Sequence, residues 1–310
     1  MPSDGYNDTI YALNAQAKVR EALNKSSIPQ AYQVKISLPG VVKSSLLRAL
    51  DTYAQEKSVA VSSHPHIFID DWVGIPSGEV IGENGEVWTV QKDFALGQTP
   101  VTQALYEAVI GSSLPLRNGP LYPATAISWI EAVSFCNELS KILKLTPYYE
   151  VDSSRTVTRI IDKNGEGIRL PKRHEWCYAA CASRSWAYAG SDLPDEVAWS
   201  AHNSGSKVRP TARLKHNDFG LYDMSGNVWE WCEEGARDQE QDEICSGDHH
   251  PKWLLGGSWA NHPWVFPIGE ALSELPSYRD QFMGFRIAKN IQAQASLSWS
   301  FEMNAQGQPK

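Results

Sequence analysis

The chain has 310 residues, a hydrophobic fraction of 42% and a formal net charge of −8 at pH 7, which suits one large globular domain or two modest ones. The negative charge excludes a nucleic-acid backbone as the main partner, because phosphate binding requires a basic face. No apolar run is long enough to span a bilayer. Tryptophan is frequent, at 12 residues, which favours an aromatic-rich core or an aromatic-lined surface.

The N-terminal 66 residues show two stretches with apolar residues near helical spacing, residues 10–23 and 42–54. Pro29 and the pair Pro39-Gly40 break the chain between them. We expect residues 1–66 to form a helical extension packed on the main body; a partner-binding helical arm is the alternative. The opening residues are polar, and no signal peptide is recognised there.

The next segment predicts strands followed by a helix. Strands are expected at 67–69, 72–76 and 87–90, with a turn at Gly82 to Gly85. Residues 94–102 then lead into a helix over 102–110. Thr99 is expected to cap this helix, with Pro100 at its first position. Gly111 is expected to end it.

A second helix is expected to begin at Ser128, where Glu131 three residues later completes a capping box. Residues 157–161 and 167–170 are predicted to form a hairpin, because Asn164-Gly165 between them is a strong turn signal. Pro171 is expected to open a third helix. Residues 183–217 are predicted to be mostly irregular, residues 233–250 an acidic loop, and residues 291–310 a polar tail.

The five cysteines are odd in number and lack regular spacing, so they do not form a disulfide framework. They are Cys136, Cys177, Cys181, Cys232 and Cys245. Cys177 and Cys181 share one helix face, but no second pair has ligand spacing. We therefore expect buried free thiols.

Three motifs organise the C-terminal half. Residues 226–231 (GNVWEW) alternate as a half-buried strand does, with glycine before the strand. Residues 253–259 (WLLGGSW) and 284–286 (GFR) complete the group. Together with residues 169–176 and 126–133, these motifs resemble the sulfatase-modifying-factor family, typified by formylglycine-generating enzymes.

The resemblance covers roughly residues 67–290 and implies an α+β fold. It is the C-type lectin fold of the formylglycine-generating-enzyme subtype, loop-rich, with short antiparallel sheets and a few helices. Fold does not fix function, so the site needs a separate argument.

The family's enzymes oxidise a cysteine with copper held by two cysteines, which correspond roughly to Asn261 and Phe266 here. No cysteine occurs from Ser246 to Lys310, and neither side chain replaces a thiolate on copper. A related branch holds iron with histidines from an added helical domain. Here the N-terminal segment offers only His64 and His66, which fit a loop better than an iron site. No catalytic residue and no cofactor are therefore expected.

Two other metal candidates have simpler interpretations. His249 and His250 beside Asp248 lie in a polar loop, where solvated side chains are expected. Asn227 and Glu230 suit a structural calcium site, but we favour buried polar groups that satisfy loop backbone. The sequence therefore predicts no metal ligand.

The segment 253–286 also resembles the variable proteins of diversity-generating retroelements, a group that includes a spirochaete lipoprotein. In those proteins a lectin-fold segment ending in Gly-Phe-Arg carries varied residues on a constant scaffold. The resemblance assigns scaffold roles to Trp229, Trp231, Gly256, Gly257, Trp259, Arg279, Gly284 and Arg286. It assigns ligand-binding, variable roles to Ala260, Asn261, His262, Trp264, Val265, Phe266, Glu270, Tyr278, Asp280 and Gln281. Phe282 and Met283 are left open between surface and core.

The sequence thus predicts a non-enzymatic protein that displays a diversified C-terminal surface to a macromolecular ligand, expected to be a protein. Exposed aromatic side chains supply rigid contact area in such surfaces. A cofactor-dependent oxidase of the same family and a carbohydrate-binding lectin module are the alternatives. We expect a monomer at the cell surface or outside the cell, lipid-anchored in its full-length form.

Overall fold

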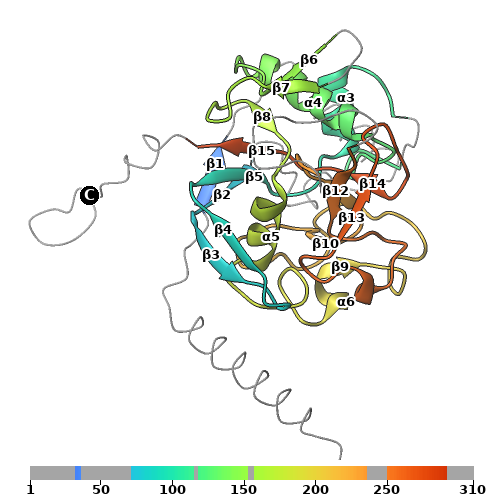
Figure 1. Cartoon of the computed structure of the whole chain (residues 1–310). Coiled ribbons are helices and arrows are strands. Elements are labelled where there is room, and N and C mark those ends of the chain that lie inside the picture. Colours follow the sequence, from blue (N-terminus) through green and yellow to red (C-terminus); the bar gives the residue numbers. More distant parts are fainter. Residues whose placement is uncertain (1–31, 36–70, 115–117, 153–156, 236–249, 292–310) are drawn as a thin grey trace, which may run out of the picture.

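The computed structural model describes residues 32–35, 71–114, 118–152, 157–235 and 250–291 (Figure 1). The helices expected over 10–23 and 42–54, the strand expected at 67–69 and the tail from 292 lie outside these residues. Residues Tyr32–Lys35 form strand β1, which the helical prediction for residues 1–66 did not include.

The largest sheet brings the end of the described chain beside its beginning. Its strands, in spatial order, are β1, β2 (Asp71–Ile75), β5 (Phe94–Gly97), β15 (Ala288–Asn290) and β8 (Ile168–Arg169). All neighbours are antiparallel. Because β15 lies between β5 and β8, the residues just after Gly284-Phe285-Arg286 are fixed inside this sheet.

A second, four-stranded sheet carries the C-terminal motifs. Its spatial order is β13 (Ala271–Glu274), β12 (Lys252–Leu255), β11 (Trp229–Trp231) and β14 (Met283–Gly284). Strands β11 and β12 are antiparallel, whereas β11 and β14 are parallel. After β12 the chain returns as edge strand β13 and then crosses to β14 on the opposite edge, and the predicted variable residues lie on these two connections, 256–270 and 275–282.

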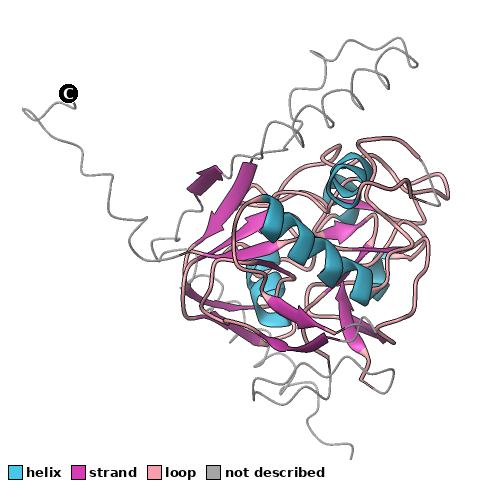
Figure 2. Ribbon diagram, turned by 90° about the horizontal axis from the view of Figure 1, so that it is seen from above, coloured by secondary structure: helices cyan, strands magenta, loops and turns pink. Residues whose placement is uncertain are grey.

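The other elements are short and joined by long loops (Figure 2). Three two-stranded sheets pair β3 (Gly78–Ile81) with β4 (Val87–Val90), β6 (Tyr149–Val151) with β7 (Val157–Ile160), and β9 (Ala198–Trp199) with β10 (Ser225–Gly226). The helices are α3 (Gln103–Ile110), α4 (Trp129–Ile142), α5 (Arg173–Cys181), α6 (Pro194–Val197) and the 3-10 helix η2 (Pro263–Val265). The loop-rich α+β fold predicted from the sequence is confirmed.

Helix ends follow local chemistry. The capping box at α4 is confirmed: the Ser128 backbone N–H donates to Glu131 at 2.9 Å, and Ser128 Oγ accepts from the Glu131 N–H at 3.3 Å. The predicted cap of α3 is wrong. Thr102 caps that helix, because its hydroxyl accepts from the Leu105 N–H, while the Thr99 hydroxyl donates to the Pro100 carbonyl. Gly111 ends α3 in a left-handed conformation, as expected.

The predicted hairpin around Asn164-Gly165 is also wrong. The turn exists, with Gly165 N–H donating to the Asp162 carbonyl at 3.0 Å. However, β7 pairs with β6, and β8 pairs with β15 in the large sheet. A side chain at Gly167 would clash with the backbone of Thr146, so the chain passes close to that segment and separates from β7.

Two clusters of buried side chains form the core. One gathers aromatic residues of α3, α4 and the end of β14, where Phe135 packs edge-on against Phe285 with ring centroids 5.2 Å apart. The other surrounds α5 and includes Trp176 and Cys177. Four described cysteines are buried free thiols, as predicted, and Cys245 lies outside the described residues.

Candidate ligand-binding surface

A buried ion pair joins the two motif strands to α5. Glu230 and Arg286 are fully buried, and the guanidinium donates to both carboxylate oxygens, from Nε at 2.6 Å and from Nη2 at 2.8 Å. The indole N–H of Trp176 donates to the same carboxylate at 2.6 Å. Arg286 also donates to the carbonyls of Gly97 and Tyr222, at 2.9 Å each. The pair is thus fully hydrogen-bonded, which a buried charge requires.

Asn227 serves the loop backbone, as the favoured interpretation predicted. It has a φ of 65°, its amide nitrogen donates to the Arg209 carbonyl at 3.1 Å, and its amide oxygen accepts from the Arg209 N–H at 3.0 Å. Since the oxygens of Glu230 are likewise occupied by N–H donors, neither residue offers a free ligand for calcium.

Gly256 and Gly257 turn the chain sharply where β12 ends. Their φ values are 93° and 78°, a region that only glycine enters without strain. A side chain on Gly257 would overlap the ring of Phe266, which lies against it and is 1% exposed. The prediction that Phe266 is a surface contact residue is therefore wrong: the space left by Gly257 admits its ring to the core.

Asn261 also faces inward. Its amide oxygen accepts from the Trp229 indole N–H at 2.9 Å and from the Ser258 N–H and hydroxyl at 3.0 and 2.6 Å. This oxygen organises the loop, while the side chain is half-buried, so a ligand-binding role for its amide N–H groups stays a prediction. The positions assigned by resemblance to the copper-binding cysteines thus hold a hydrogen-bonded amide and a packed aromatic ring.

The remaining predicted contact residues reach the surface. Ala260, His262, Trp264, Val265, Glu270, Tyr278 and Gln281 are exposed, and Asp280 is half-buried. We refer to these eight positions as the display surface. Among the described residues, eight large hydrophobic side chains are exposed, and five of them fall between positions 264 and 278: Trp264, Val265, Leu272, Leu275 and Tyr278. Exposed hydrophobic side chains concentrated in one segment of the chain favour a binding surface there.

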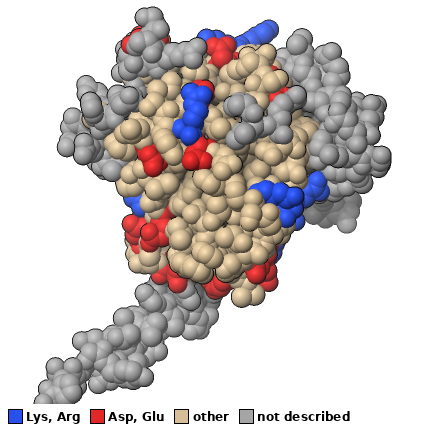
Figure 3. Space-filling model, turned by 90° about the vertical axis from the view of Figure 1, so that its right-hand side faces the viewer, with Lys and Arg blue, Asp and Glu red and all other residues tan. Residues whose placement is uncertain are grey.

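The two loops of the display surface meet at their bases. The ring of Trp259 lies 5.0 Å from the ring of half-buried Phe282, and the Trp229 N–H donates to the Phe282 carbonyl at 2.8 Å. Figure 3 views the molecule from the side on which these C-terminal loops lie in Figure 1, and a broad part of that face consists of uncharged residues. The two loops are therefore joined at their bases by the contact between the Trp259 and Phe282 rings. Met283, the residue after Phe282, is buried.

The scaffold residues are buried with two exceptions. Trp229, Trp231, Gly256, Gly257, Gly284 and Arg286 are buried, and Trp259 is half-buried. Arg279 was predicted as part of the frame but is exposed, and it pairs with Glu131 of the α4 capping box at 3.1 Å. The Ala126 N–H donates to the Asp280 carbonyl at 3.0 Å, so both contacts attach this loop to the start of α4.

His202 was missed by the sequence analysis. It is exposed and lies against the display surface, with its Nε2 atom 3.1 Å from Nδ1 of His262. Its ring also lies 5.9 Å from that of Trp264. The two histidines are 60 positions apart in the chain, and no local pattern in the sequence connects them.

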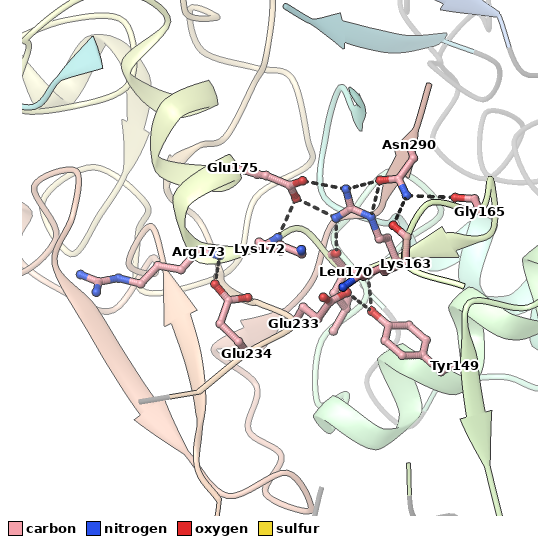
Figure 4. A network of polar contacts seen from close by, with 11 residues as sticks. Tyr149, Lys163, Gly165, Leu170, Lys172, Arg173, Glu175, Glu233, Glu234 and Asn290 are labelled. Atoms are coloured by element: carbon pink, nitrogen blue, oxygen red, sulfur yellow. Dashed lines mark hydrogen bonds and ion pairs between the residues drawn. The ribbon is translucent and has the colours of Figure 1, made fainter. Parts of the chain in front are cut away.

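A second buried polar network surrounds Arg169 (Figure 4). Its guanidinium donates to both oxygens of Glu175, at 2.7 Å each. Burial raises the pKa of Glu175, but the charge and hydrogen bonds of Arg169 outweigh burial, and the pKa lies below its ordinary value. Burial, followed by the charge of Glu233, raises the pKa of Glu234 to about 7.

The Glu234 carboxylate accepts from the Arg173 N–H at 2.6 Å, at the first turn of α5. Because these groups are enclosed by side chains from α5, β15 and β6, they hold the domain together. Within the described residues no group of three or more His, Cys, Asp or Glu side chains is placed so that it could hold a metal ion. Asp248 and His249 lie outside those residues. No helix of the described chain is long and apolar enough to cross a membrane.

The fold, the buried Glu230–Arg286 frame and the exposed C-terminal loops define a C-type-lectin-like protein of the formylglycine-generating type. A family model described as "Sulfatase-modifying factor enzyme 1-like domain" matches residues 60–291. The chain therefore belongs to the sulfatase-modifying-factor family.

Three relatives carry different names. "Chaperone protein LppX" of Paenibacillus barcinonensis is 32% identical over 203 residues, covering 54% of this chain and 70% of that protein. The formylglycine-generating enzyme of Streptomyces coelicolor is 22% identical over 244 residues, covering 70% and 66%. An inactive C-alpha-formylglycine-generating enzyme 2 of Bos taurus is 24% identical over 209 residues, covering 61% and 57%. The family thus includes proteins named as enzymes and proteins that are not.

Among solved structures, Treponema denticola variable protein 1 superposes with a TM-score of 0.62 and 28% sequence identity. The match covers 73% of this chain and 98% of that one. Nearly the whole of the variable protein therefore has a counterpart in the present fold.

Proposed function

We propose that this chain is a non-enzymatic ligand-binding protein, in which the buried frame holds a C-terminal surface whose residues are diversified. One observation carries the proposal: five of the eight large hydrophobic side chains exposed among the described residues lie between positions 264 and 278, and three of them, Trp264, Val265 and Tyr278, belong to the display surface. Rigid aromatic side chains on a fixed backbone bind with little loss of conformational entropy.

The likeness to a variable protein supports the same proposal. The match covers 73% of this chain and 98% of the variable protein. Residues of the display surface change identity without unfolding the protein when their side chains contribute little to the core.

The oxidase alternative has less support. The amide oxygen of Asn261 already accepts three hydrogen bonds, and Phe266 fills the space beside Gly257. A thiolate pair for copper has no counterpart at these two positions. The relative named as inactive is a precedent for loss of the activity within this family.

A protein is the partner that the surface fits best. The display surface contains exposed tryptophan and tyrosine, two residue types that are enriched at the centre of protein interfaces. The chaperone name of one relative points to the same class of partner. We infer a monomer that acts at the cell surface or outside the cell through a lipid anchor in its full-length form.

The test is to sequence the coding region of residues 253–286 in many cells of one population. Diversification predicts differences confined to the display surface and absent at Gly256, Gly257 and Arg286. An unvarying sequence, or differences spread evenly over frame and surface, contradicts the proposal. Oxygen consumption with a cysteine-containing peptide and added copper would instead support the oxidase alternative.

A further inference from the structure

Two histidines and a tryptophan form a compact exposed group. His262 Nδ1 lies 3.1 Å from His202 Nε2, and the ring centroids are 5.1 Å apart at an interplanar angle of 66°. Trp264 stacks on His262 at 4.2 Å with an interplanar angle of 6°. Both histidines are exposed.

Backbone hydrogen bonds hold the two histidine loops together. The Ala201 N–H donates to the Asn261 carbonyl at 2.9 Å, directly beside both histidines. Two positions further on, the Ser204 hydroxyl donates to the Trp259 carbonyl at 3.0 Å. The spacing of the imidazoles is thus set by the backbone, with the Trp264 stack limiting rotation of one ring, and this preorganisation favours ligand binding.

The spacing matches that of two ligands on one metal ion. Two Zn–N bonds of about 2.0–2.1 Å at a tetrahedral angle place the nitrogens about 3.3 Å apart. The observed separation of 3.1 Å is close to this value. Both rings coordinate as neutral imidazoles with their protons on the remote nitrogens, so the proton now shared between Nδ1 and Nε2 moves by tautomerisation.

We propose that His202 and His262 chelate a divalent late transition-metal ion such as Zn²⁺ on the display surface. Two imidazoles are fewer than the three or four protein ligands of a resident zinc site, so the ion exchanges readily. Its remaining coordination positions face solvent, where water fills them or a donor side chain of a bound partner replaces the water. This inference goes beyond the proposed function and does not depend on diversification.

The experiment is a zinc titration of the untagged, metal-stripped full chain by calorimetry. Replacing either ligand, as His202→Gln or His262→Gln, should weaken zinc binding about tenfold or more, since losing even an outer-shell partner costs 10- to 100-fold. Unchanged affinity in both variants overturns the proposal. Thermal unfolding of each variant checks the fold, which we expect to be retained because both side chains are exposed.

Other histidines supply the controls. His216→Gln changes an exposed histidine that contacts the Asn217 carbonyl and Tyr222, and it should bind zinc as the parent does. The double variant His249→Gln/His250→Gln tests the adjacent pair in the acidic loop. In addition, NMR of histidine labelled with ¹⁵N should show zinc-dependent shifts at His262 Nδ1 and His202 Nε2. Shifts confined to other imidazoles contradict the assignment.

Discussion

The buried frame, which consists of Glu230, Arg286 and the buried scaffold residues around them, is close to the display surface in the chain. The two regions differ in how many partners each side chain has. Glu230 accepts from two residues, and Arg286 reaches two further segments, at the carbonyls of Gly97 and Gln98 and at that of Tyr222. Trp264, only a few positions from Gly257, is 66% exposed and touches mainly His262 and His202. The identity of a frame residue is therefore set by several contacts at once, whereas a surface residue is constrained by few.

This contrast explains how one short segment both anchors its own loop in the core and presents side chains at the surface. From Gly256 to Phe266 the chain places Asn261 and Phe266 inward, and Ala260, His262 and Trp264 outward. The inward side chains fix the loop, so the outward ones are free to differ. Substitutions in the buried frame and on the display surface test this contrast, and the expected losses of stability decrease from the first substitution below to the last.

The largest effect is expected at the buried ion pair. Glu230→Gln leaves the Arg286 charge buried without its counterion, which costs about 3–5 kcal/mol. Chemical denaturation should show a loss of this size or failure to fold. The control is Glu138→Gln, which removes an exposed pair with Lys141 and should cost about 0.5 kcal/mol or less. Equal effects for the two variants contradict the assigned role of Glu230.

The next effect is expected at Gly257. Gly257→Ala adds a methyl group that overlaps the Phe266 ring at a φ of 78°, and we expect a loss of about 2–4 kcal/mol from strain and overpacking. Gly85→Ala is the matched control, because Gly85 has a φ of 84° and open space around it. It should lose only about 1 kcal/mol. The difference between the two unfolding free energies isolates the packing against Phe266.

A smaller, pH-dependent effect is expected at Glu234. The pKa of about 7 in the folded protein lies above the ordinary value of 4.5, so the protonated form favours folding. Its contribution is complete below about pH 4.5 and is lost as the pH rises through about 7. Glu234→Gln stays neutral and keeps an acceptor for the Arg173 N–H. Relative to the parent, its unfolding free energy should rise by about 1–3 kcal/mol from pH 5 to pH 8. A difference that does not change with pH rules out the raised pKa.

The smallest effect on stability is expected at Trp264. Trp264→Ala should change the unfolding free energy by about 0.5 kcal/mol or less, since the side chain is mostly in solvent. Partner binding should weaken far more, because exposed tryptophans carry a large share of interface energy. A large loss of stability would place Trp264 in the frame.

Two of the local features were predicted correctly from the sequence, whereas the cap of α3, placed at Thr99 and found at Thr102, and the long-range strand pairing were not. The Ser128–Glu131 capping box and the Gly111 helix end depend on residues a few positions apart, and both were predicted correctly. The Asn164-Gly165 turn was also found, but the partners of β7 and β8 lie in separate sheets. A turn motif determines where the chain reverses direction, whereas contacts with distant strands determine which strands pair with each other.

The candidate ligand-binding surface shows the same difference between features that depend on nearby residues and features that depend on distant ones. Exposure of His262, Trp264 and Tyr278 agreed with expectation, because no core periodicity runs through these residues. Phe266 was misplaced because its burial depends on the missing side chain of Gly257, nine positions earlier. His202 was missed because only the folded chain brings it to His262. Such contacts between loops leave no trace in local sequence.

The most direct test of the account replaces six of the eight display-surface residues at once. Thermal unfolding would be measured for a variant with serine at His262, Trp264, Val265, Glu270, Tyr278 and Gln281 together. The account predicts a midpoint within about 2–4 °C of the parent, equivalent to about 1 kcal/mol in a domain of this size. A fall as large as that caused by Gly257→Ala alone would show that these positions belong to the folding core.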